Sequence, residues 1–350
     1  MVCRQTPHAS LHFCCRKSIM ILRIYSTNQP HGLFAIIFMM LTVLVPSAWL
    51  GGLPLTQTGF HADWLFSFLT GSPILQVLTA LALISAGAFA ANAIFNRHDF
   101  YNTPVYHVAL SYAMIATSLS CFRFQPSILL ANLLVLGGIN SYFKIGKQSH
   151  INHEVFTSTI FFGCATLIYP PYLLSIISVL FTCWFVRGFH LREFIIAVIG
   201  FGTAWLYWYA YCYMAHRLDT SAPFTFPDAR LNALDLFNQS PWVELFYGAI
   251  TVAVLLAAVR YILLNARISN KAKTLKNALL LLCICLCGAL GIHFWMADQW
   301  GVSAIILPFT FILGYWFTHY RVTIAAPFMY YVLGICSIFL VLHHYGILPS

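Results

Sequence analysis

The residues best suited to chemistry lie between long apolar stretches. Asp63 is a carboxylate that could act as a general base on an acceptor hydroxyl. Arginines in other connections could hold a phosphate, because the guanidinium offers parallel N–H donors to the phosphate oxygens. The candidate substrate-binding residues are Arg123, Tyr169, Arg217, Arg230 and Asp298. Ordinary interfacial charges are the alternative interpretation, since spacing alone does not bring these residues together.

Motifs of soluble enzymes are absent from the sequence. It contains no phosphate-binding glycine loop, dinucleotide fingerprint, HExxH or nucleophile elbow. The cysteines of CICLC at 283–287 are two residues apart, so on a helix they point to diverging faces. His150 and His153 have helical spacing but no third ligand nearby. We therefore expect neither a metal nor another cofactor.

Composition indicates that lipid is the solvent for most of the chain. Of its 350 residues, 60% are hydrophobic and 8% are charged, whereas about a quarter of the residues in a soluble domain are charged. The net charge of +9 comes from 18 Lys and Arg against 9 acids. In a membrane protein such an excess marks cytoplasmic connections, so we expect no nucleic-acid partner.

The apolar pattern predicts an all-α, polytopic transmembrane helix bundle with about eleven spans in one domain, residues 31–345. The expected spans are 33–53, 73–95, 105–122, 126–143, 155–169, 172–187, 193–214, 242–262, 275–295, 300–318 and 323–343. Residues 155–187 could instead form one helix kinked at Pro170-Pro171.

The distribution of basic residues predicts how these spans are oriented in the membrane. With a cytoplasmic N-terminus, only Arg123, Arg217 and Arg230 of the 18 Lys and Arg fall outside. Merging the fifth and sixth spans would place the basic segment 260–276 outside, so an external hairpin at 169–172 is preferred. Residues 1–30 are then a cytoplasmic tail, with Met20 as an alternative start. The long external loops are 54–72, which includes an amphipathic stretch suited to the membrane surface, and 215–241.

Polar and small residues within the spans predict how the helices pack. The span interiors lack Lys, Arg, Asp and Glu, which disfavours an ion-driven transporter. We expect interhelical hydrogen bonds from Gln76, Asn92, His107, Asn132, Asn140, His293 and His319. Close helix contacts are expected at Ala86, Gly87, Ala90, Gly137, Gly138, Gly200 and Gly202.

Five segments resemble an uncharacterised family of bacterial polytopic inner-membrane proteins, a domain of unknown function. They are NQPHGLFAIIF (28–38), ANAIFNRHDFYN (91–102), ILLANLLVLGGINSYFKI (128–145), GCATLIYPPYLLSIISVL (163–180) and RGFHLREFIIAVIGFGTAWLYWY (187–209). The likeness covers about residues 20–215. It implies a bacterial inner-membrane location and transfers no catalytic residue.

A more distant likeness concerns the span that ends in Tyr-Pro-Pro and the Arg-containing turn after the next span. This order is similar to segments of membrane glycosyltransferases and surface-glycan polymerases that use polyprenyl-linked sugars. Such enzymes commonly carry an acidic residue in the first external loop, where Asp63 lies. The extended acidic motif and the large external domain of many such enzymes are missing, so the sequence leaves catalysis open.

Three functions follow as hypotheses. The first is the handling or transfer of polyprenyl-linked sugars in cell-envelope glycan assembly, with membrane lipids and polyprenyl phosphate as partners. The second is a non-catalytic subunit or scaffold of an envelope complex, which would bind another membrane protein. The third is a lipid or small-molecule transporter, for which an internal repeat would be expected.

Overall fold

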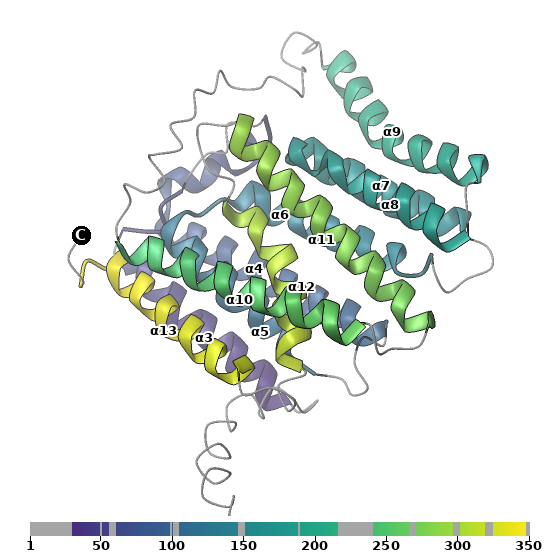
Figure 1. Ribbon diagram of the computed structural model, residues 1–350. Coiled ribbons are helices and arrows are strands. Elements are labelled where there is room, and N and C mark those ends of the chain that lie inside the picture. The colour runs from purple at the N-terminus through teal and green to yellow at the C-terminus, as the bar shows by residue number, and fades with distance from the viewer. Residues whose placement is uncertain are drawn as a thin grey trace, which may run out of the picture.

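A computed structural model describes residues 30–49, 51–55, 61–98, 100, 105–145, 151–187, 190–215, 241–265, 270–296, 302–318 and 325–347. These residues form eleven α-helices and three short 3₁₀ helices (Figure 1). The α-helices are α3 (Pro30–Trp49), α4 (Pro73–Arg97), α5 (His107–Phe122), α6 (Pro126–Tyr142), α7 (Asn152–Ile168), α8 (Leu174–Arg187), α9 (Leu191–Met214), α10 (Pro241–Asn265), α11 (Asn270–Met296), α12 (Ile306–Thr318) and α13 (Ala325–His344). The 3₁₀ helices are η1 (His61–Gly71), η2 (Pro170–Leu173) and η5 (Val302–Ile305).

The all-α class is confirmed, and each expected span overlaps one α-helix. Four helices, α3, α4, α9 and α10, are long and apolar enough to cross a membrane. Among the described residues, shorter apolar helical stretches of 10–17 residues lie in α5, α6, α8, α11, α12 and α13, so eleven crossings remain a prediction, as does the side on which the N-terminus lies.

The two prolines after Tyr169 separate α7 from α8. Helix α7 ends where the Tyr169 N–H donates to the Ala165 carbonyl at 2.8 Å. Proline has no N–H to continue this ladder, so the chain turns through η2 instead. Thr182 of α8 then lies 2.5 Å from the Tyr142 hydroxyl at the end of α6. The alternative of one kinked helix over 155–187 is therefore wrong.

Consecutive helices alternate in direction, so their connections gather at two ends of the bundle. The hairpin end contains residues 51–55, 123–125 and 169–173. There the Phe124 N–H donates to the Pro54 carbonyl at 2.9 Å. The opposite end contains the connections after α4 and α6, where Lys144 and Glu154 form an ion pair at 3.3 Å. Connections predicted to share one side of the membrane thus share one end of the structure.

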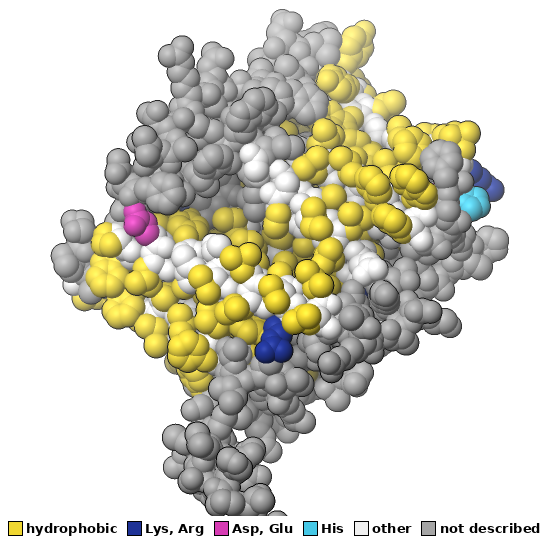
Figure 2. All heavy atoms as spheres, in the orientation of Figure 1, with side chains coloured by type: hydrophobic (Ala, Val, Ile, Leu, Met, Phe, Trp, Pro, Cys, Tyr) yellow, Lys and Arg dark blue, Asp and Glu magenta, His cyan; other side chains and the backbone are white. Residues whose placement is uncertain are grey.

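Helix α5 lies at the centre of the bundle. Every residue from His107 to Cys121 is buried, because α3, α4, α12 and α13 all pack against this helix. Helix α9 lies at the edge, against α7 and α8 (Figure 1). Its outward side chains are largely apolar and exposed, among them Leu206 at 65%. Hydrophobic side chains cover much of the described surface in Figure 2, as expected where lipid is the solvent.

Glycines bring several of these helices together. A Cβ at Gly87 would overlap the Tyr112 ring of α5, and one at Gly138 would lie 2.6 Å from Phe162 of α7. A Cβ at Gly137 would lie 3.0 Å from Phe161, and one at Gly200 would overlap the Thr159 side chain, both in α7. Gly202 faces open space and Ala86 is exposed, so the expectation of close packing at these two positions is wrong. Both residues lie on the face of their helix that is turned away from the neighbouring helix.

Candidate functional site

The hairpin end is organised by buried side-chain amides. Gln76 of α4 donates from Nε2 to the Leu69 carbonyl and accepts from the Leu53 N–H, both at 2.9 Å. These bonds fix η1 and the segment 51–55 on the start of α4. Gln76 was expected to join helices, and its partners are instead the backbone of two connections. Such backbone needs an internal partner because lipid offers none.

An amide network, defined here as Gln125, Asn132, Tyr172 and Ser303, joins distant parts of the chain. The Ser303 N–H donates to Gln125 Oε1 at 3.2 Å, and Asn132 Nδ2 donates to the Ser303 carbonyl at 2.9 Å. The Tyr172 hydroxyl donates to Asn132 Oδ1. All four residues are buried. The expected hydrogen-bonding role of Asn132 is confirmed: both polar atoms of its amide have hydrogen-bond partners, so this network stabilises packing.

Tyr169, a candidate substrate-binding residue, lies directly beside this network. Its side chain is fully buried and meets the Tyr172 ring edge-on, with centroids 4.8 Å apart. Its surroundings are therefore those of a packed aromatic residue beneath the hairpin. The predicted role in binding is not tested by this position.

Arg123 has different surroundings, immediately after the end of α5. It is half-buried, and its guanidinium carbon lies 5.5 Å from the centroid of the Phe122 ring. Within the described part of the chain its side chain forms no ion pair or hydrogen bond. Tyr247 of α10 lies within electrostatic range of this guanidinium, without a hydrogen bond between the two side chains. The Tyr247 hydroxyl is buried and likewise has no hydrogen-bond partner among these residues. This Arg123–Tyr247 pair offers guanidinium N–H donors and a hydroxyl that can donate or accept.

The remaining candidate residues are placed only in part. Asp63 lies in the first turn of η1, which packs against α4, α6 and α7 at the hairpin end. The structure gives the backbone of Asp63 and does not describe its carboxylate. Arg217, Arg230 and Asp298 lie outside the described residues. Their convergence with Arg123 therefore stays a prediction.

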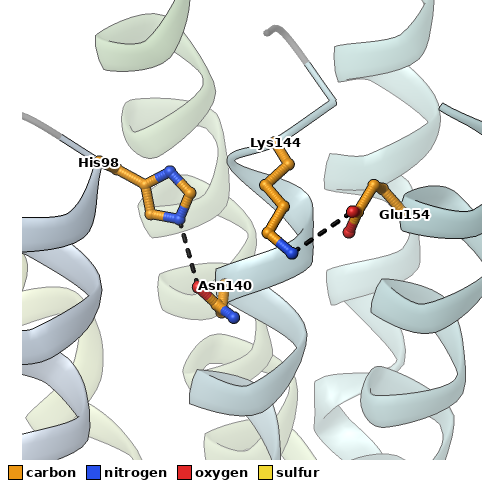
Figure 3. A network of polar contacts seen from close by, with 4 residues as sticks. All are labelled: His98, Asn140, Lys144 and Glu154. Atoms are coloured by element: carbon orange, nitrogen blue, oxygen red, sulfur yellow. Dashed lines mark hydrogen bonds and ion pairs between the residues drawn. The ribbon is translucent and has the colours of Figure 1, made fainter. Parts of the chain in front are cut away.

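The opposite end carries two polar contacts between helices (Figure 3). His98 Nε2 lies 3.3 Å from Asn140 Oδ1, which links the end of α4 to α6 and confirms the expected interhelical role of Asn140. Lys144 and Glu154 form their ion pair across the connection from α6 to α7. Glu154 is buried and Lys144 is half-buried. These contacts join the end of α4 to α6, and the end of α6 to α7, at this end of the bundle.

A third polar cluster at the opposite end was not expected from the sequence. Lys276 of α11 is only 7% exposed, and its Nζ donates to the Tyr315 hydroxyl of α12 at 2.7 Å. The Tyr261 hydroxyl of α10 donates to the Lys276 carbonyl at 2.6 Å. Glu193, at the start of α9, is also buried. Lys276 and Glu193 lie at the beginnings of the expected spans 275–295 and 193–214, whereas the prediction of no charge concerned the span interiors.

Neither metal-binding geometry nor similarity to known proteins assigns a function to further residues. Among the side chains that the structure describes, no three His, Cys, Asp or Glu lie close enough to hold a metal ion. Comparisons with protein-family models, with curated proteins and with solved structures found no match for this chain.

Proposed function

We propose that this chain is a multi-pass bacterial inner-membrane protein that binds the phosphate or diphosphate of a polyprenyl-linked sugar at its hairpin end, in the assembly of cell-envelope glycans. The observation that carries the proposal is the Arg123–Tyr247 pair, in which a half-buried cation and a buried hydroxyl have no acceptor among the described residues. The proposal includes eleven crossings, a cytoplasmic N-terminus and an external hairpin end.

The electrostatics of Arg123 favour an anionic ligand. A half-buried cation without a counter-charge has lost part of its hydration, at a cost below that of a fully buried unpaired ion. A phosphate would offset this cost through two parallel hydrogen bonds to the guanidinium. The Tyr247 hydroxyl would donate a third. Ligand binding thus supplies the acceptors that the polypeptide does not.

The surface of α10 suits the lipid part of such a ligand. This helix carries Tyr247 and exposes Leu245, Val252 and Leu255. A polyprenyl chain could lie along these side chains while its phosphate reaches the Arg123–Tyr247 pair. The burial of apolar surface would add affinity at about 25 cal/mol per Å².

A transferase form of this proposal needs a base and further ligands. Asp63 is the candidate base, because η1 is fixed at the same end as Arg123. Arg217, Arg230 and Asp298 complete the candidate substrate-binding set. Binding without transfer would need only the cationic residues, so the Asp63→Asn variant separates the two forms by losing transfer and keeping the lipid.

The proposal is tested by mass spectrometry of lipids that co-purify in mild detergent. We expect a polyprenyl phosphate or polyprenyl-linked sugar with the wild-type protein and a loss of at least about tenfold in Arg123→Ala, the effect of one charge-assisted contact. Arg192→Ala is the matched control, since Arg192 is an exposed arginine at the start of α9. Bulk phospholipid alone in the wild-type sample, or an equal loss in the control, would refute the proposal.

A scaffold of an envelope complex is the second candidate, and helix α9 favours it. This helix packs mainly on α7 and α8 and exposes Tyr207, Tyr209, Tyr211 and Tyr213 towards its end. Tyrosine is common where a helix meets the membrane interface or a partner. A stoichiometric membrane protein that co-purifies with the wild type and is lost when these tyrosines become leucine would support this function.

A further inference from the structure

The Lys276 cluster at the opposite end has the composition of an anion site. Three helices meet there, since Tyr261 of α10 and Tyr315 of α12 both hydrogen bond to Lys276 of α11. The Lys276 Nζ lies 4.7 Å from the centroid of the Tyr315 ring, and the rings of Tyr261 and Tyr315 meet edge-on at 4.7 Å. The ammonium group is therefore held in one position by aromatic side chains.

Lys276 nevertheless lacks a counter-charge. An ammonium group has three N–H donors, and only the Tyr315 hydroxyl accepts one within the described residues. The Lys144–Glu154 pair is elsewhere at this end, between α6 and α7. A buried charge without a carboxylate is costly unless another anion approaches it. Two N–H donors are thus available to a ligand.

The sequence around Lys276 offers no acid to fill this role. Asp298 is the sole acid after Glu244, and it follows α11 at the other end of that helix. The other cations after Glu244 in the sequence are Arg260, Arg267, Lys271, Lys273 and Arg321. Lys271 and Lys273 belong to the first turn of α11. The acids of α7 and α9, Glu154 and Glu193, are buried, and among the described residues neither forms an ion pair with Lys276, so an external anion is left to balance its charge.

We propose that Lys276 binds a phosphate group at the opposite end of the bundle, with Tyr261 and Tyr315 positioning its ammonium group. The phosphate belongs to an anionic membrane lipid or to a soluble phosphate compound; both present the same charged oxygens to the amine. This site is independent of the Arg123–Tyr247 pair, which lies at the hairpin end of α10, and it does not depend on the function proposed above.

The test measures lipid binding by native mass spectrometry. Wild-type protein is titrated with phosphatidylglycerol and, as the neutral-headgroup comparison, with phosphatidylcholine. We expect one phosphatidylglycerol molecule to be retained in about 0.5 M NaCl, where exposed charges are screened beyond a few ångströms. Loss of both phosphatidylglycerol and inorganic pyrophosphate at this salt concentration would show diffuse surface attraction and overturn the proposal, without any substitution in the protein. If inorganic pyrophosphate binds under the same conditions and phosphatidylglycerol does not, the source of the phosphate is soluble.

Two substitutions make the test specific to Lys276. Lys276→Met keeps most of the side-chain volume and removes the charge, so the retained phosphate ligand should bind at least about tenfold more weakly. Arg260→Met is the matched control, because Arg260 is an exposed cation next to Tyr261; it should change the affinity less than about twofold. Wild-type affinity in Lys276→Met, or an equal loss in Arg260→Met, would contradict a site at Lys276.

Discussion

The amide network at the hairpin end permits a quantitative prediction about Asn132. Replacing Asn132 by Ala removes the bonds to the Ser303 carbonyl and the Tyr172 hydroxyl, both within a fully buried site. Interhelical hydrogen bonds in membrane proteins contribute about 0.6 kcal/mol each on average and up to about 1.7 kcal/mol. A buried polar group left without its partner costs about 1–3 kcal/mol. We therefore expect Asn132→Ala to lower the free energy of unfolding by about 2–4 kcal/mol.

The assay is reversible unfolding in mixed micelles as the fraction of denaturing detergent rises, with linear extrapolation of the free energy. Asn92→Ala is the matched control. Asn92 is also a buried asparagine, on α4, but its Oδ1 has no hydrogen-bond partner in the described structure. Its replacement should change the free energy of unfolding by less than about 1 kcal/mol, since no bond to this oxygen is lost.

A double-mutant cycle then isolates one bond of the network. Tyr172→Phe removes the donor to Asn132 Oδ1 and keeps the ring packed on Tyr169. Combined with Asn132→Ala, the cycle should give a coupling free energy of about 1 kcal/mol. If Asn132→Ala costs no more than Asn92→Ala, or the coupling free energy is zero, the network does not stabilise the bundle and the reasoning fails.

Two further predictions concern packing and orientation. Gly87→Ala should destabilise the protein by about 1–3 kcal/mol, because the added methyl group overlaps Tyr112, whereas Gly202→Ala, in open space within α9, should stabilise it by about 0.5–1 kcal/mol; equal effects in the same unfolding assay would contradict the helix contact at Gly87. Reporter fusions at residues 147 and 271 should report the cytoplasm and a fusion at 230 the outside, and an external signal at 271 would reverse the proposed orientation.

The sequence predicted where the helices lie along the chain better than it predicted which helices pack against one another. Long apolar stretches mark helices, and Pro170-Pro171 marks the turn between α7 and α8, because these signals are local. Which helix lies at the centre is not a local property. Helix α5 is buried on all sides while α9 is largely exposed, yet both are rich in apolar residues, since lipid and a neighbouring helix select the same side chains.

The residues of the candidate site could likewise be predicted only where the signal in the sequence is local. Arg123 could be singled out because it is one of few cations predicted outside, but its electrostatic effect on Tyr247 depends on how α12 and α13 place α10. Gln125 and Ser303 were missed because each resembles an ordinary residue at the start of a helix or turn. Lys276 was counted with the cytoplasmic cations, and only the tyrosines of two other helices show that it is buried. The signal in the sequence that could have indicated this burial was a lysine directly before a long apolar stretch.

The shortness of α5 has a consequence for the depth at which a ligand would bind. With 16 residues, α5 is about 24 Å long, whereas the hydrocarbon core of a bilayer is about 30 Å thick. Helices α4 and α10 have 25 residues each and are about 38 Å long. Arg123, which directly follows α5, therefore lies within the thickness that the longer helices span. For the lipid binding proposed at Arg123, head groups would have to descend or the bilayer would have to thin, so that binding should weaken as acyl chains lengthen.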